Sequence, residues 1–243
     1  KGMHTSALFG FVNQIMKLIN TEKPDLMIAA FDSPQKTFRH ERYSEYKATR
    51  EKMPEEMIEQ LPYLWNILES MDIPLLEEPG FEADDIIGTL ATKASKKGLD
   101  VFIVSGDKDF MQLINDKIFL YAPSGRQTDI KIYDREGVIE KWGVPPEKII
   151  DLLGLMGDSS DNVPGVLGVG EKTAVKLINE YGSLESSLDN ANHVKNKRAR
   201  EGLLNSKENA ILSKELVTIE TQMDLEINFS QLKTNNVKKE SLA

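Results

Sequence analysis

One helix-then-strand pattern in the sequence, GFEADDIIGTLATKASKKGLDVFIVSGDKDF, carries five carboxylates at its two ends. Like charges held close together repel one another, so a fold that gathers them without a counter-ion loses stability. The pattern therefore predicts an α/β unit whose acidic ends face a positively charged ligand. The five residues are Glu82, Asp84, Asp85, Asp107 and Asp109.

The order of apolar segments predicts an α/β fold with a mostly parallel sheet flanked by helices. Continuous apolar runs are typical of parallel strands buried on both faces. Two such runs are followed by the shorter strands KIFLY and DIKIY, which are separated by the turn-like APSGRQT. The expected helices cover residues 6–20, 54–72 and 82–98, and the buried strands cover residues 26–31 and 100–104.

These signals divide the chain into three parts, because strand patterns stop near residue 143 and helices dominate afterwards. We expect an α/β core at residues 1–143, a helical subdomain at 144–225, and a tail or linker at 226–243. No apolar run approaches the ~18 residues of a membrane span, and the start of the chain lacks the pattern of a signal peptide. A membrane partner is therefore not expected.

The absence of cysteine excludes disulfides and thiolate metal sites from this chain. The three histidines are far apart in the sequence, so a zinc site built on histidine is not expected. Any bound metal would be a hard cation held by oxygen, either magnesium or manganese. The net charge of −9 argues on its face against a nucleic-acid partner. If eight acids form one site, however, the rest of the chain is nearly neutral and has local basic segments.

Three further acids complete this group of eight. Asp32, like Asp107 and Asp109, follows the carboxyl end of a predicted strand, the edge where open parallel sheets bind ligands. Asp158 and Asp161 form another pair in GDSSDN. Taken singly, such acids cap helices or form turns, which is the alternative interpretation. Taken together, the eight acids suit two hard divalent ions that activate water for phosphodiester hydrolysis.

A second motif, NVPGVLGVGEKTAVKLINEYG, predicts a glycine hairpin followed by a helix. Glycines let backbone N–H groups approach a phosphate closely, and the helix N-terminus adds its dipole. The alternative is a plain helix–turn–helix corner, but the Lys-Thr-Ala that follows favours binding of the DNA backbone. The motif is not a Walker loop, because G-x-x-x-x-G-K-[ST] is absent. The predicted contacts are Gly165, Gly168, Gly170, Lys172 and Thr173.

Residues 36–52, KTFRHERYSEYKATREK, interleave basic and aromatic side chains with little apolar periodicity. This composition suits phosphate neutralisation with base stacking, although a solvated surface helix is an equal alternative. The predicted DNA contacts in its first part are Lys36, Arg39 and Arg42. A shorter basic run, HVKNKRAR, indicates a surface rather than a site.

Five segments of the chain resemble the 5′→3′ exonuclease domains of bacterial DNA polymerase I, which belong to the flap-endonuclease superfamily. The segments are FDSPQKTFRHERYSEYKATR, GFEADDIIGTLA, VSGDKDFMQL, GDSSDNVPGVLGVGEKTA and YGSLE. The resemblance implies a divalent-metal-dependent nuclease that hydrolyses phosphodiester bonds at 5′ flaps, nicks and primers in DNA replication and repair. It implies two Mg²⁺ or Mn²⁺ ions. In the family pattern, Asp32, Glu82, Asp84 and Asp85 serve the first ion, and Asp107, Asp109, Asp158 and Asp161 favour the second.

The resemblance also implies roles for the basic segment and the hairpin. Residues 33–60 match a helical clamp around a single-stranded 5′ end. In that clamp Tyr46 would stack on a base, while Lys47 and Arg50 would hold the scissile phosphate as catalytic residues. The hairpin is similar to a helix-hairpin-helix that grips duplex DNA and binds a potassium ion through backbone carbonyls.

The implied partners are nicked or branched DNA with a 5′ flap, and RNA primers on DNA. A polymerase domain is expected in a longer chain, and the protein is expected to be a monomer of the bacterial cytoplasm, associated with the nucleoid.

The chain departs from the family pattern at its start. In the family, a strand that ends in aspartate and a short helix precede the point matching Lys1. The missing carboxylate favours an alternative function, a catalytically impaired module that binds flaps or nicks. A PIN-like ribonuclease shares the acidic core, but the long hairpin and the basic clamp argue against it.

Overall fold

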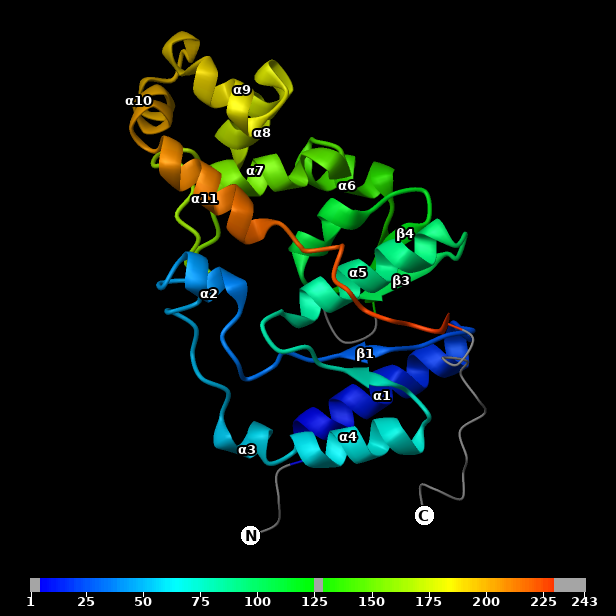
Figure 1. Cartoon of the computed structure of the whole chain (residues 1–243). Helices are drawn as coiled ribbons and strands as arrows, with labels where there is room; N and C mark the ends of the chain where they lie inside the picture. Colours follow the sequence, from blue (N-terminus) through cyan, green and yellow to red (C-terminus); the bar gives the residue numbers. More distant parts are fainter. Residues whose placement is uncertain (1–4, 125–128, 230–243) are drawn as a thin grey trace. The chain divides into compact units, whose positions relative to one another are not determined.

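The computed structural model describes residues 5–124 and 129–229 (Figure 1). The chain divides into two compact units. Unit 1 contains the residues up to Gln35, the segment Glu51–Ala83 and the residues from Asp224 onward. Unit 2 contains the remaining segments, Lys36–Arg50 and Asp84–Met223. The boundaries expected near residues 143 and 225 stay predictions, and the expected tail lies almost entirely outside the described residues.

Unit 1 packs two helices beside a short parallel strand pair. Helices α1 and α4 lie side by side (Figure 1), and their apolar faces bury Ile15, Leu64 and Leu68. The predicted strand at 26–31 is only two residues long, and its residues are half-buried rather than buried on both faces. The elements of unit 1 are α1 (Ser6–Thr21), β1 (Ala29–Ala30), α3 (Glu55–Ile58), α4 (Leu61–Ser70) and β2 (Leu75–Leu76), with β1 and β2 parallel.

Unit 2 contains a second, three-stranded sheet in the order β3-β4-β5. Strand β3 (Val101–Val104) is parallel to β4 (Ile118–Ser124), which is antiparallel to β5 (Asp129–Tyr133). The predicted strands therefore exist, but the described strands form two small sheets, of which one is mixed. Burial alternates along β3, since Ile103 is 3% exposed while Phe102 is 51% exposed. The expectation that this strand is buried on both faces is wrong.

The rest of unit 2 is helical. Helix α7 contacts α8, α9 and α11, and together they bury the larger apolar core of the molecule. Helix α5 ends shortly before Gly98, and α8 ends before Gly182, as the sequence predicts. The helices are α2 (Phe38–Arg42), α5 (Ala83–Lys96), α6 (Arg135–Trp142), α7 (Ile149–Met156), α8 (Glu171–Tyr181), α9 (Leu184–Asp189), α10 (Lys197–Asn205) and α11 (Lys207–Val217), with short 3₁₀ turns η1 (Lys108–Leu113), η2 (Pro146–Lys148) and η3 (Ala191–His193).

Capping side chains define where two helices of unit 2 begin. Asp134 accepts the Gly137 N–H at the start of α6, and Asn196 accepts the Ala199 N–H at the start of α10. Such caps satisfy N–H groups that have no partner within the helix. Among the residues that the structure describes, no helix has the length and apolar character needed to cross a membrane.

Candidate active site

Two predicted metal ligands lie in unit 1 at the beginning of α5. Asp32 follows β1, and its Oδ1 accepts a hydrogen bond from the Ala83 N–H at 2.8 Å. One oxygen of the Asp32 carboxylate is therefore already bonded to a backbone N–H group in this structure. Glu82 directly precedes the helix and is only 5% exposed. Asp84, in the first turn of α5, is half-buried and belongs to unit 2.

Four charged residues of unit 2 meet just after β3, and we call Asp107, Lys108, Asp109 and Asp158 the Lys108 cluster. Asp107 caps η1, because its Oδ1 accepts the Asp109 N–H at 2.8 Å. The Lys108 ammonium donates a hydrogen bond to Asp158 Oδ2, and its Nζ lies 3.5 Å from Asp109 Oδ1. Lys108 therefore bridges two of the predicted metal ligands, Asp109 and Asp158, which are far apart in the sequence.

Lys108 is not among the residues predicted from the sequence. The sequence signal that could have identified Lys108 is its position between Asp107 and Asp109, because a lysine between two acids at a sheet edge can pair with either of them. In this structure it supplies the positive charge that the acidic pattern requires. The expected positively charged partner is thus partly present within the chain itself.

The electrostatics of the cluster are uneven. The pKa of the Asp109 carboxyl is raised to about 7, first by burial and then by neighbouring carboxylates, with Lys108 opposing. Burial also opposes ionisation of Asp158, but its hydrogen bond and charge interaction with Lys108 outweigh burial and lower its pKa. Within the described residues, Asp109 Oδ1 is the one buried side-chain oxygen or nitrogen that makes no hydrogen bond.

We expect this raised pKa to make stability depend on pH when divalent ions are absent. The pKa of Asp109 in the folded protein, about 7, lies above its ordinary value of 3.8, so the folded state binds the proton more tightly and stability falls as pH rises through this range. Relative to Asp109→Asn, the unfolding free energy of the unmodified chain should fall by roughly 1–2 kcal/mol between pH 6 and pH 8. Urea denaturation in EDTA measures this difference. Parallel pH profiles for the two proteins would contradict the raised pKa.

The donor atoms of the cluster fit a hard divalent cation. Carboxylate oxygens are its preferred ligands, and Asp109 Oδ1 lacks a hydrogen bond that a metal would replace. Across residues 5–124 and 129–229, however, no three histidine, aspartate or glutamate side chains are close enough together to hold one ion. Lys108 offers a physical reason, because its ammonium group already pairs with Asp109 and Asp158. The single eight-acid cluster stays a prediction.

Asp161 joins the predicted clamp segment to the loop after α7. Its Oδ1 accepts a hydrogen bond from Arg50 Nε at 2.9 Å. Its Oδ2 accepts one from Tyr46 Oη at 3.3 Å and lies 3.8 Å from Lys47 Nζ. The backbone N–H of Lys47 also donates to the Asp161 carbonyl at 2.9 Å. The structure therefore brings both predicted phosphate-binding residues onto one predicted metal ligand.

The structure contradicts the predicted stacking of Tyr46 on a DNA base. Tyr46 is only 4% exposed, and its ring packs edge-on against His40 with 5.4 Å between the centroids. Stacking requires an accessible ring face, which Tyr46 does not offer. Phe38, which is 39% exposed, is the more accessible aromatic side chain of the segment.

Arg39 and Asp85 form a buried ion pair. The Arg39 Nη1 and Nη2 groups donate to the two Asp85 oxygens at 2.7 and 2.8 Å, and the side chains are 3% and 0% exposed. Arg39 also donates to the Leu216 and Thr218 carbonyls, while Asp85 accepts the Glu220 N–H at 2.9 Å. The predictions that Arg39 contacts DNA and that Asp85 binds metal are contradicted, because each side chain is buried and neutralised by the other.

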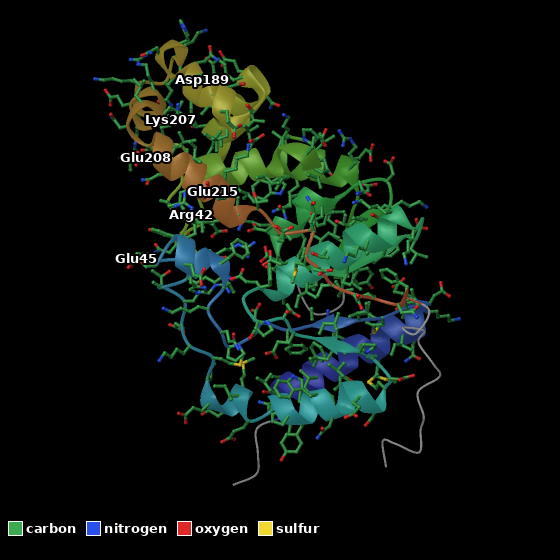
Figure 2. All side chains as sticks on the ribbon, viewed as in Figure 1. Arg42, Glu45, Asp189, Lys207, Glu208 and Glu215 are labelled. Atoms are coloured by element: carbon green, nitrogen blue, oxygen red, sulfur yellow. The ribbon has the colours of Figure 1, made fainter. Side chains whose placement is uncertain are left out.

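Arg42 lies on the exposed side of α2. It pairs with Glu215 of α11 at 2.6 Å (Figure 2), and the two side chains are 56% and 47% exposed. Lys36 precedes the same helix and is also exposed. Both predicted DNA contacts are therefore accessible to a phosphate group.

The hairpin between α7 and α8 contains one glycine that serves packing. Gly165 has a φ of +61°, and a Cβ there would lie 2.5 Å from the Gly157 nitrogen. Its N–H donates to Ser213 Oγ at 2.8 Å in the interior. Only glycine allows this close backbone approach. The structure contradicts the predicted phosphate contact at Gly165, because the residue is buried and its N–H is already used.

The other predicted hairpin contacts are accessible. Gly168 is partly exposed and follows Leu167, which is 75% exposed. Gly170 is exposed, and a Cβ there would meet no atom within 4 Å. Lys172 in the first turn of α8 is exposed, and Thr173 is half-buried. These residues stay predicted DNA contacts.

Two family models together match almost the whole chain. The model described as "5'-3' exonuclease, N-terminal resolvase-like domain" matches residues 1–143, and "5'-3' exonuclease, C-terminal SAM fold" matches residues 144–240. The chain belongs to the 5'-3' exonuclease family. This confirms the resemblance inferred from the motifs.

Similar proteins agree with this assignment. DNA polymerase I of Bacillus subtilis (strain 168) is 46% identical over 242 residues, which are 100% of this chain and 28% of that protein. The 5'-3' exonuclease of Aquifex aeolicus (strain VF5) is 42% identical over 96% of this chain and 78% of its own length. The structure of T5 5'-exonuclease with divalent zinc ions bound has a TM-score of 0.74 and 27% identity, covering 91% of this chain and 83% of that one. The predicted α/β fold class with a helical C-terminal part is confirmed.

Proposed function

We propose that this chain hydrolyses phosphodiester bonds at 5′ flaps, nicks and primers in DNA replication and repair. One observation carries the proposal: the two predicted phosphate contacts, Lys47 and Arg50, both form ion pairs with Asp161, a predicted metal ligand. Cationic and carboxylate groups side by side suit a reaction that needs both a held phosphate and a metal-activated water. Membership of the 5'-3' exonuclease family supports the same reaction.

The proposed ligands of a divalent ion, magnesium or manganese, are Asp107, Asp109 and Asp158, which would have to release Lys108 and move closer together to hold it. When bound, it supplies charge stabilisation for the phosphoryl oxygens and lowers the pKa of water. The bound zinc ions of the T5 5'-exonuclease support metal dependence here. A second ion is proposed from the family resemblance. The further ligands proposed on that basis are Asp32, Glu82, Asp84 and Asp161.

Lys47 and Arg50 would bind the scissile phosphate in place of the Asp161 carboxylate, with which both side chains pair in this structure. Asp161 now holds both side chains, so their charges stay paired before DNA arrives. The Arg50 guanidinium is 47% exposed and presents the forked donors that suit a phosphate. Lys47, at 14% exposed, would hold the phosphate from a more enclosed position.

Replacing Lys47 with alanine is expected to slow flap cleavage by about 100-fold, because one donor to the developing phosphate charge is lost. Single-turnover cleavage with enzyme in excess measures this step. The matched control is Lys52→Ala, an exposed lysine at the end of the same basic segment that is not a predicted phosphate contact, which should cleave at the normal rate. A normal rate for Lys47→Ala would contradict the clamp interpretation and favour the alternative, a solvated surface segment.

The proposal also covers the partners. Duplex DNA would be held by the hairpin, with a potassium ion at its backbone carbonyls, and an RNA primer on DNA would be a further substrate. The relatives named DNA polymerase I support a polymerase domain in a longer chain. We propose a monomer that works on the nucleoid in the bacterial cytoplasm.

The test is cleavage of a 5′-labelled flap duplex in magnesium or manganese, against an EDTA blank. Release of the flap only when metal is present is the expected result. Binding without cleavage in any metal would instead support the alternative, a catalytically impaired flap-binding module, which family membership does not favour.

A further inference from the structure

The beginning of α10 packs directly on the glycine hairpin. A Cβ at Gly168 would lie 2.6 Å from Arg198 Cγ and 3.0 Å from its Nε, so the arginine stem lies against the glycine. A Cβ at Gly202, one helical turn later, would lie 2.0 Å from the Leu167 carbonyl oxygen. These two close contacts hold one face of α10 against the exposed end of the hairpin.

The run HVKNKRAR, which contains the first turn of α10, carries four cations and no acid. Two of them are engaged: Arg200 Nη1 donates to the Val194 carbonyl at 3.0 Å, and Lys197 Nζ lies 3.9 Å from Glu201. Arg198 is exposed, and within the part of the chain that the structure describes it makes no hydrogen bond or ion pair. Its stem is positioned by the hairpin while its guanidinium is available to an anion.

We propose that Arg198 is a phosphate contact for duplex DNA and extends the hairpin surface from α8 onto α10. Exposed Lys172, in the first turn of α8, follows the hairpin in the sequence and supplies a second cation at its end. The chain has a net charge of −9, and acidic groups are available to pair with most of its cations. An arginine that stays unpaired beside the proposed DNA-binding hairpin therefore suits contact with a polyanion such as DNA. The contact is to the sugar–phosphate backbone, so it carries no sequence preference.

This inference rests on the proposed function, because it names a further contact for the same substrate. The partner is the duplex and not the single-stranded flap, since the hairpin rather than the clamp segment positions Arg198. An effect of Arg198 on duplex binding that is absent on single strands is therefore the specific expectation.

The experiment is fluorescence anisotropy of the 243-residue chain with a labelled nicked duplex, in EDTA, over a series of salt concentrations. Arg198→Gln should weaken binding about 3- to 10-fold and lower the slope of log Kd against log salt by about one. Arg198→Lys should keep most of that slope, because it keeps the charge. Lys197→Gln, a cation removed from the neighbouring position of the same helix, should bind as the unmodified chain does.

Unchanged affinity and salt slope for Arg198→Gln, with an unchanged melting temperature, would overturn the inference. An equal loss for Lys197→Gln would overturn it too, because a general charge effect would then explain both. An equal loss on a single-stranded oligonucleotide would refute the assignment to duplex. Failure of the unmodified chain to bind any nicked duplex would refute the proposed function itself, which separates the two conclusions.

Discussion

Replacing Asp107 with asparagine is expected to slow metal-dependent flap cleavage by on the order of 10³-fold, since a carboxylate ligand is worth several kcal/mol of charge stabilisation. Asparagine can still accept the Asp109 N–H through its side-chain oxygen, so the cap of η1 survives. The substitution therefore removes a charge without removing a structural hydrogen bond. Binding of flap DNA in EDTA should change less than about twofold, because the hairpin and α10 are untouched.

Asp134→Asn is the matched control for this prediction. Asp134 caps α6 by accepting the Gly137 N–H at 2.8 Å, so the chemical change is the same and the hydrogen bond that the side chain accepts has the same length. It lies outside the Lys108 cluster, and we expect normal cleavage. Calorimetric titration with Mn²⁺ gives a readout apart from activity, in which Asp107→Asn should lose affinity and Asp134→Asn should not. Equal cleavage by the two variants would remove Asp107 from the metal site.

Replacing Arg39 with alanine is expected to lower the free energy of unfolding by about 3–5 kcal/mol, because Asp85 is left as an uncompensated buried charge. The loss also frees the Leu216 and Thr218 carbonyls, which Arg39 now bonds. Those carbonyls lie in the last turn of α11 and directly after it, so the end of this helix should loosen. Urea denaturation at neutral pH measures the change.

Arg42→Ala provides the control for the buried pair. Arg42 is three residues further along the same segment and also pairs with a carboxylate, Glu215, but both side chains are about half exposed (Figure 2). Water screens such a pair, so its removal should leave the free energy of unfolding nearly unchanged. Similar losses for the two arginine variants would show that Arg39 and Asp85 do not form the buried pair in solution.

Motifs in which the sequence order itself encodes the geometry were predictable. Asp107 and Asp109 follow β3, and Gly168, Gly170 and Lys172 lie at the accessible end of the hairpin, because short spacing within a turn limits where these groups can lie. The helix over α1 and the end of α5 before Gly98 were predictable for the same reason.

Residues whose role depends on distant partners were mispredicted. Arg39 and Tyr46 look like DNA contacts in a basic, aromatic segment, yet one is bonded to Asp85 and the other packs on His40. Gly165 looks like a phosphate-binding glycine, but Gly157 and Ser213 enclose it. These neighbours cannot be predicted from the local sequence pattern, because they lie on other elements of the fold.

The sequence by itself determined the family, the acidic residue set and the hairpin, since each is a short motif whose residue types and spacing carry the chemistry. Only the tertiary structure decided which cation pairs with which anion. The ion pairs that it forms are Lys108 with Asp158, Arg39 with Asp85, and Arg50 with Asp161. The physical reason is that burial and charge pairing depend on what long-range folding brings alongside. A charged residue that the sequence pattern suggests as a ligand can instead form an ion pair within the folded chain, when folding places an opposite charge beside it.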